Sequence, residues 1–143
     1  MGLGVLGNIG LTMLTNAGAE ESYVVMGACA ECSFGSMSDR LILPLSHGVY
    51  IKGKAQLNIM DFKPFLNILP FGMCSSLLNP AVAAATAAKN GVLQKMPCTP
   101  VVVTPWMNGK TDKLVENFPA LLNKSTNMCL FAGYISINDD GQK

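Results

Sequence analysis

The chain has 143 residues, a length typical of one domain, and a formal net charge of +1. Only 13% of its residues are charged and half are hydrophobic, whereas about a quarter are charged in an average domain. The Lys and Arg residues are scattered, so the charge excludes nucleic acid as the expected partner. Fourteen Gly and eight Pro indicate short elements joined by many turns.

Residues 1–22 form an apolar N-terminal arm that begins MGLGVLGNIGLTMLTNAGAE. A signal peptide starts with a positively charged region, but the first basic residue here is Arg40. We therefore expect no signal peptide. The segment is also too short and too interrupted by polar residues for a membrane span, so we expect either a poorly packed arm or a helix that docks on a partner.

The next part of the chain predicts short strands. Residues 23–28 (YVVMGA) are rich in β-branched and aromatic types and predict a first strand. The stretch LILPLSHGVYIKGKAQLNIMD predicts strands interrupted at Pro44 and Gly48. Residues 52–54 predict a hairpin tip, at which Gly53 suits a positive φ.

One helix is predicted, at residues 80–89. Asn79 is a suitable N-cap and Pro80 suits the first helical position. AVAAATAAK supplies strong helix formers, and residues 90–91 (Asn-Gly) give a C-terminal stop. Because almost every side chain is Ala, the helix is not an amphipathic surface helix. We expect it to pack closely against a sheet or a partner.

The C-terminal third predicts further β structure. TPVVVTP (99–105) predicts an edge strand bounded by prolines, and FAGYISIN (131–138) predicts a final strand with alternating burial. The segments VYIKGKAQLN (49–58) and LVENFPALLN (114–123) align without gaps and share Ala, Leu and Asn. They predict a repeated hairpin, and therefore a compact β structure with internal pseudo-symmetry.

Several motifs then fall in one order, and together they resemble a known family. They are CSFG (32–35), IMDFKPFLNILPFGMC (59–74), NPAVAAATAAKNGVLQKMPC (79–98), TPW (104–106), PALLN (119–123), and MC followed by GYISI (128–137). This set is similar to the PAAR-like spike-tip proteins of bacterial contractile injection systems, such as type VI secretion and related phage-tail-like particles. The resemblance runs from about Val24 to Asp139, and the block from FGMC to MPC is its most specific part.

The resemblance implies a mainly β, compact conical domain over residues 23–139, followed by a loose tail at 140–143. Such a domain consists of short strands and hairpins with pseudo-threefold symmetry and one short Ala-rich helix. It implies a structural protein, not an enzyme, that caps and sharpens a trimeric VgrG-type spike. The tip would aid puncture of the target envelope through transient contact with its membrane, and it would also recruit effector cargo. It would reside in the bacterial cytoplasm during assembly and then be ejected.

Two other functions stay open at this stage. One is a small membrane-active secreted effector that uses the apolar arm, and the other is a free-standing metal-binding module. Catalysis has little support, because the chain has one His, no phosphate-binding Gly-rich loop and no prominent pair of carboxylates.

Four of the five cysteines lie in the motifs quoted above: Cys32, Cys74, Cys98 and Cys129. Four thiolates can hold zinc tetrahedrally, and a metal would stabilise a tapered tip that has little core. Buried free thiols are a second interpretation, and disulfides such as Cys74–Cys98 are a third. Cys29 forms CAEC with Cys32, but a redox site there would need a helix N-terminus that SFGS does not predict.

One position departs from the family pattern. Phe62 stands where members of the family usually carry His in M-D-H-K-P, which weakens the transfer of any site containing that His. His47, the single histidine, would either replace one thiolate or be an ordinary loop residue. Trp106 would be an interface anchor or the cap of a small core. Asp61 and Lys63 are expected in a solvated turn.

Overall fold

The computed structural model describes residues 20–143, so the predicted arm, apart from residues 20–22, lies outside the described part. The elements in chain order are β1 (Cys29–Cys32), β2 (Asp39–Arg40), β3 (Tyr50–Ile51), β4 (Lys54–Ala55), β5 (Met73–Cys74), α1 (Pro80–Ala88), β6 (Met96–Pro97), β7 (Lys110–Val115), β8 (Phe118–Ala120), β9 (Thr126–Met128) and β10 (Tyr134–Asp139). The prediction of a mainly β fold with one short helix is confirmed.

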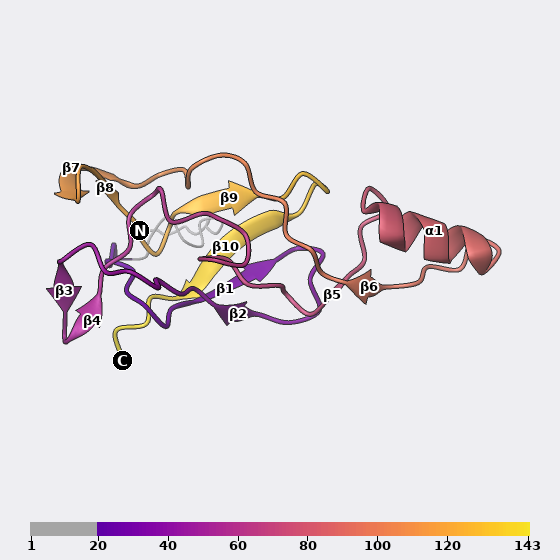
Figure 1. Cartoon of the computed structure of the whole chain (residues 1–143), viewed down its shortest axis with the longest axis horizontal. Helices are drawn as coiled ribbons and strands as arrows, with labels where there is room; N and C mark the ends of the chain where they lie inside the picture. The colour runs from indigo at the N-terminus through magenta and orange to yellow at the C-terminus, as the bar shows by residue number, and fades with distance from the viewer. Residues whose placement is uncertain (1–19) are drawn as a thin grey trace, which may run out of the picture.

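The strands form one larger sheet and three separate ribbons. The sheet has the order β2-β1-β10-β9 and every pairing in it is antiparallel. The ribbons are the pairs β3-β4, β5-β6 and β7-β8. Figure 1 shows two ribbons, β3-β4 and β7-β8, at one end of the long axis, and the β5-β6 ribbon carrying α1 at the opposite end. The molecule therefore narrows from a wide end with two hairpins to a single projecting helix.

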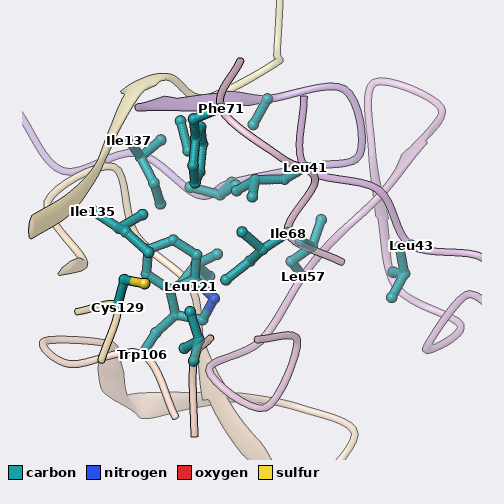
Figure 2. Close-up of a cluster of buried hydrophobic side chains, with 14 of the residues drawn as sticks. Leu41, Leu43, Leu57, Ile68, Phe71, Trp106, Leu121, Cys129, Ile135 and Ile137 are labelled. Atoms are coloured by element: carbon teal, nitrogen blue, oxygen red, sulfur yellow. The ribbon is translucent and has the colours of Figure 1, made fainter. Parts of the chain in front are cut away.

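The core lies between the large sheet and the loops that cover it. Phe71, Leu41 and Ile135 are almost fully enclosed there (Figure 2). Trp106 is 3% exposed, and its indole N–H donates to the backbone oxygen of Asp61 over 2.9 Å. Burial of the ring with its donor satisfied is typical of a core tryptophan. Trp106 thus caps the core and is not available as an interface anchor.

Three extended segments at 22–26, 55–59 and 119–123 meet in a closed backbone ring. Val24 N–H donates to the Leu121 oxygen (3.0 Å), Leu121 N–H to the Leu57 oxygen (3.1 Å), and Leu57 N–H to the Val24 oxygen (3.0 Å). All three side chains are fully buried. Each segment donates to one neighbour and accepts from the other, as a threefold axis requires.

A second set of contacts follows the same rule. We call Val24, Leu57 and Leu121 the ring residues. In each segment, the residue two positions after the ring residue donates its N–H to a neighbouring segment. The acceptor is the carbonyl oxygen two positions before the neighbour's ring residue. The bonds run from Met26 to Ala55 (2.7 Å), from Ile59 to Pro119 (3.0 Å) and from Asn123 to Ser22 (2.9 Å). Antiparallel bridges between Tyr23 and Leu122, Val25 and Gln56, and Asn58 and Ala120 complete the pattern. The pseudo-threefold symmetry that the family resemblance implies is therefore present in the backbone of these segments.

The two predicted hairpins lead directly into this ring. Their tips are Lys52-Gly53 and Glu116-Asn117, with φ of 52° and 78° in the first tip and 51° and 72° in the second. Two successive positive φ values are typical of the type I′ turns that suit a two-residue hairpin. The repeated hairpin is thus confirmed, and so is the positive φ of Gly53.

Other strand predictions were wrong. Within 23–28 only isolated bridges form, at Tyr23 and Val25, and the first strand is CAEC at Cys29–Cys32. Residues 99–105 contain no strand. Pro100 and Pro105 have no backbone N–H, which leaves this segment with fewer donors for pairing with a neighbouring strand. The final strand is confirmed as β10, whose burial alternates along Ile135, Ser136 and Ile137.

The predicted helix is confirmed, but its surroundings differ from expectation. Asn79 Oδ1 accepts from the N–H of Ala81, Pro80 occupies the first turn, and Gly91 N–H bonds back to the Thr86 oxygen in the C-terminal stop. The main element that α1 contacts is β6, its own ribbon. The helix therefore projects from the body instead of packing against the large sheet (Figure 1).

Candidate functional site

The four cysteines singled out in the sequence come together in one pocket. Cys32 ends β1, Cys74 lies in β5, Cys98 follows β6, and Cys129 follows β9. They line a cavity of about 10 Å³, roughly the space of one water molecule. The pocket lies where the β5-β6 ribbon leaves the body, so it joins the projecting helix to the large sheet. Cys29 is not among its lining residues.

Two glycines allow the chain to close around this pocket. A Cβ on Gly133 would lie 2.4 Å from the Cys32 Sγ, and a Cβ on Gly35 would lie 2.6 Å from the Phe71 Cβ. Both distances are too short for non-bonded atoms. Gly35 also bridges Cys74 in antiparallel fashion. The CSFG and CLFAGY segments thus need glycine for close approach.

Two of the thiols in the pocket, Cys32 and Cys98, favour their neutral form. Burial raises the pKa of Cys32 and of Cys98, and the neighbouring thiols add to both increases. A raised pKa lowers the thiolate fraction and with it nucleophilicity. All five cysteines are free, so no disulfide closes the pocket. CAEC lies in a strand, which leaves a redox site at a helix N-terminus without structural basis.

The arrangement of the four cysteines fits the zinc hypothesis only in part. Four cysteines are a donor set that suits zinc, and they surround a space of atomic size. However, among residues 20–143 no three His, Cys, Asp or Glu side chains are placed so that they could hold one metal ion. The four thiols are therefore neighbours in an apolar pocket but do not form a ready ligand set.

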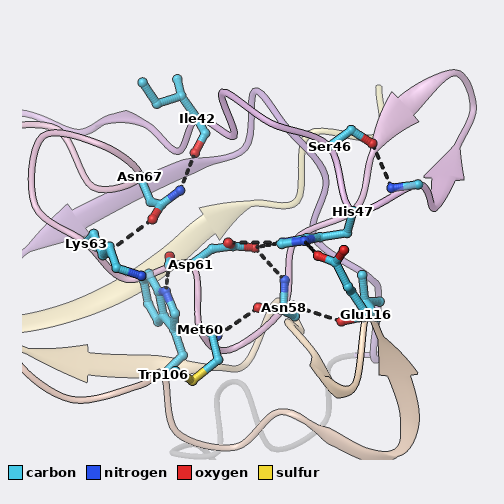
Figure 3. A network of polar contacts seen from close by, with 12 residues as sticks. Ile42, Ser46, His47, Asn58, Met60, Asp61, Lys63, Asn67, Trp106 and Glu116 are labelled. Atoms are coloured by element: carbon cyan, nitrogen blue, oxygen red, sulfur yellow. Dashed lines mark hydrogen bonds and ion pairs between the residues drawn. The ribbon is translucent and has the colours of Figure 1, made fainter.

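His47 lies in a different place, between two carboxylates (Figure 3). Its Nε2 is 2.8 Å from Asp61 Oδ2 and its Nδ1 is 2.5 Å from Glu116 Oε1. Because both ring nitrogens face acceptors, the ring is best bonded as imidazolium, with two N–H donors. His47 therefore does not replace a thiolate at the cysteine pocket.

Asp61 is buried in this network, not solvated as expected from the sequence. Its Oδ2 also accepts the N–H of Asn58 at 2.8 Å, and the Asn58 side chain in turn donates to the Val115 oxygen at 2.8 Å. Burial disfavours the charge on His47, but the hydrogen bonds that its ring donates to Asp61 and Glu116 outweigh this effect and raise the pKa of His47. The network ties three distant segments together near the wide end.

Sequence reasoning did not find this cluster, because its members are brought together only by packing. The available signal was local: the spacing from Asn58 to Asp61 suits a carboxylate that accepts the N–H three residues before it. Nothing in the sequence connects that turn to His47 or to Glu116 in the β7-β8 hairpin.

These features define a small mainly β domain, symmetric in its backbone at one end and drawn out into a helix at the other. The chain belongs to the family described as Domain of unknown function (DUF4280), whose model matches residues 24–142. No curated protein and no solved structure matches it. In the part of the chain that the structure describes, no helix is long and apolar enough to cross a bilayer.

Proposed function

We propose that this protein is the non-enzymatic tip of a contractile injection system, seated on a trimeric VgrG-type spike. The observation that carries the proposal is the pseudo-threefold ring of Val24, Leu57 and Leu121. The end of a trimer presents the same surface three times around its axis, so one chain can bind all three copies evenly only by offering three similar edges.

The shape of the molecule indicates which end would face the spike. The wide end carries the ring and two hairpins, while α1 projects from the other end (Figure 1). Leu114 and Phe118 of the β7-β8 hairpin are exposed at the wide end, as is Tyr50 of β3. Apolar and aromatic side chains of this kind are enriched at protein interfaces. We assign the wide end to the spike and the helix end to the target envelope.

Its mechanism would be mechanical. A contracting sheath supplies the force, and a rigid, narrow tip concentrates it on the target membrane. The backbone ring and the buried His47 network would supply rigidity at the base. In this proposal the protein assembles in the bacterial cytoplasm, leaves with the apparatus, and recruits effector cargo through surface contacts.

Zinc at Cys32, Cys74, Cys98 and Cys129 is a further part of this proposal. The thiols that would hold it already surround one small space. Bound as thiolates they would link the ribbon that carries α1 to the large sheet, and zinc binding would add folding free energy there.

Affinity purification of the full chain from the producing cell tests the proposal. It should recover a trimeric spike protein, and Leu114→Glu should weaken that recovery by adding a charge to the proposed contact. Leu78→Gln, which changes an equally exposed leucine at the opposite end, should leave it unchanged. Purified injection particles that contain this chain but no trimeric spike beneath it would refute the function.

A further inference from the structure

The β5-α1-β6 unit, residues 73–98, forms a projection that we call the head. It leaves the body through a ribbon of two residue pairs, Met73 with Pro97 and Cys74 with Met96. Figure 1 shows α1 beyond the end of this ribbon, away from the large sheet. Since β6 is the main element that α1 contacts, most of the head surface has no partner within the described chain.

That surface is apolar on nearly every side. Within α1 only Val82 and Thr86 are buried. Four large apolar side chains flank the helix and are largely exposed: Leu77, Leu78, Val92 and Leu93. A helix that is apolar all round is normally enclosed by protein or by lipid. An apolar patch of this kind marks a binding surface.

The charge of the head has one sign only. No Asp or Glu occurs in the sequence between Asp61 and Asp112. Lys89 and Lys95 are both exposed and follow the helix. A second copy of the head would therefore bring lysines against lysines, with no carboxylate to pair them. An anionic surface is the complementary partner.

The loop after the helix satisfies its own polar groups although it is exposed. The Gln94 side-chain amide donates to the carbonyl oxygens of Val92 and Leu93, each at 3.2 Å. Gln94 N–H itself donates to Thr86 Oγ1 at 3.0 Å, and Gly91 N–H returns to the Thr86 oxygen at 2.9 Å. In water, exposed carbonyl groups accept hydrogen bonds from the solvent and need no donor from the protein. Donors from Gln94 to the carbonyls of Val92 and Leu93 suit a medium that offers no hydrogen bonds.

We propose that the head binds the surface of an anionic lipid bilayer. Leu78 and Leu93 enter the boundary between headgroups and acyl chains, and Lys89 and Lys95 lie at the lipid phosphates. The helix is too short to span the bilayer, so the head lies in its surface. This inference deepens the proposed function, on which it rests for its biological setting, by naming the surface that meets the target membrane.

Flotation of the full chain with lipid vesicles tests the inference. One set of vesicles is phosphatidylcholine alone, and the other is phosphatidylcholine mixed with phosphatidylglycerol. The double variant Leu78→Gln/Leu93→Gln should bind the anionic vesicles at least about tenfold more weakly, because the two leucine side chains that would enter the bilayer are lost. Lys89→Gln/Lys95→Gln should also weaken that binding several-fold, and the loss should shrink as salt is added.

Leu45→Gln provides the matched control. Leu45 is 83% exposed, compared with 63% for Leu78, but it lies in the body. It should leave vesicle binding unchanged. Because all the substituted side chains are exposed, unchanged thermal unfolding should verify that each variant is folded.

Three results would overturn the inference. They are vesicle binding that survives both head variants, binding that is equal on neutral and anionic vesicles, and head variants that lose the spike trimer while still binding vesicles. The last would make the head a protein-docking surface. Failure of the proposed function looks different: the unmodified chain would recover no spike trimer, while its vesicle binding would still depend on the head.

Discussion

The backbone N–H of Leu121 donates to the carbonyl oxygen of Leu57 over 3.1 Å, and both side chains are fully buried. The two residues occupy the same place in successive hairpins of the pseudo-threefold ring. They are therefore equivalent positions, although the ungapped sequence alignment pairs Leu57 with Leu122 instead. The spacing from hairpin tip to ring residue is the same in both hairpins, from Gly53 to Leu57 and from Asn117 to Leu121. The ungapped alignment is therefore one residue out of register with the structure, which only the backbone pairing reveals.

Because Leu57 and Leu121 occupy equivalent positions in the ring, replacing either should have a similar effect on the free energy of unfolding. Leu57→Ala and Leu121→Ala should each lower the free energy of unfolding by about 2–5 kcal/mol, since each leaves a cavity at a fully enclosed site. Chemical denaturation measures both values. Leu45→Ala, at an exposed leucine, should change it by less than about 0.5 kcal/mol. A loss below about 1 kcal/mol at either ring leucine would contradict the central place given to the ring.

The His47 network predicts that stability depends on pH. The folded pKa of His47 is raised by Asp61 and Glu116, so the folded state binds its proton more tightly than the unfolded chain does. The stabilisation is fully present below the unfolded value of about 6.5. It is lost as pH rises through the folded pKa.

His47→Gln isolates this effect, because the chain has one histidine. Unfolding free energies measured from acidic to alkaline pH should fall across that window in the unmodified chain. The fall should be absent in the variant. The groups that face His47 are Asp61, Glu116 and, in the same hollow, Lys63. An identical pH profile in both proteins would show that the ion pairs contribute nothing to stability.

The helix cap gives a prediction with a built-in control. Asn79 Oδ1 caps the helix through the N–H of Ala81, while its buried Nδ2 has no partner. Asn79→Ala should destabilise the protein by about 1 kcal/mol because the cap is lost. Asn79→Ser keeps a capping oxygen and removes the unpaired donor, so it should be close to neutral or stabilising. Thermal unfolding that ranks serine below alanine would show that the cap does not act as described.

The cysteine pocket predicts that Cys74→Ser and Cys29→Ser will differ in their effects on stability and on any bound metal. Cys74→Ser places a hydroxyl among apolar neighbours and should lower the unfolding free energy by about 1–3 kcal/mol. If the zinc proposal holds, elemental analysis of the unmodified protein should find about one zinc per chain. The same substitution should then release it.

Cys29→Ser is the control for that pair of measurements, since Cys29 lies outside the pocket. It should keep both the stability and any metal. Full stability of the Cys74 variant with no metal in either protein would contradict both the zinc proposal and the predicted cost of the buried hydroxyl. The raised pKa of Cys32 and of Cys98 also predicts that these two thiols are alkylated slowly at neutral pH.

The sequence was informative where structure is local. Asn79 and Pro80 predict the start of α1 and residues 90–91 its end, because capping depends on neighbours only. Gly53 predicts the first hairpin tip for the same reason. The β-branched run at 99–105 does not form the expected strand, and Pro100 and Pro105 have no N–H to donate to a neighbouring strand.

Features that depend on distant segments could not be read in this way. The third member of the ring, Val24, lies in a segment whose residues share almost nothing with the two hairpins, so only hydrogen bonding identifies it. The His47 ion pairs join three separate loops. The convergence of Cys32, Cys74, Cys98 and Cys129 was expected from the family resemblance, whereas their lack of a ready metal geometry appears only in the structure.

The third corner of the ring has no hairpin tip of its own. There the segment at 23–25 meets the one at 140–142: Val25 N–H donates to the Asp140 oxygen at 3.0 Å, and the Gln142 side chain donates to the Tyr23 oxygen at 2.7 Å. The tail expected to be loose is thus held against the wide end. Under the proposed function, a protein fused to residue 143 would therefore emerge beside the spike, at the end of the molecule opposite to α1.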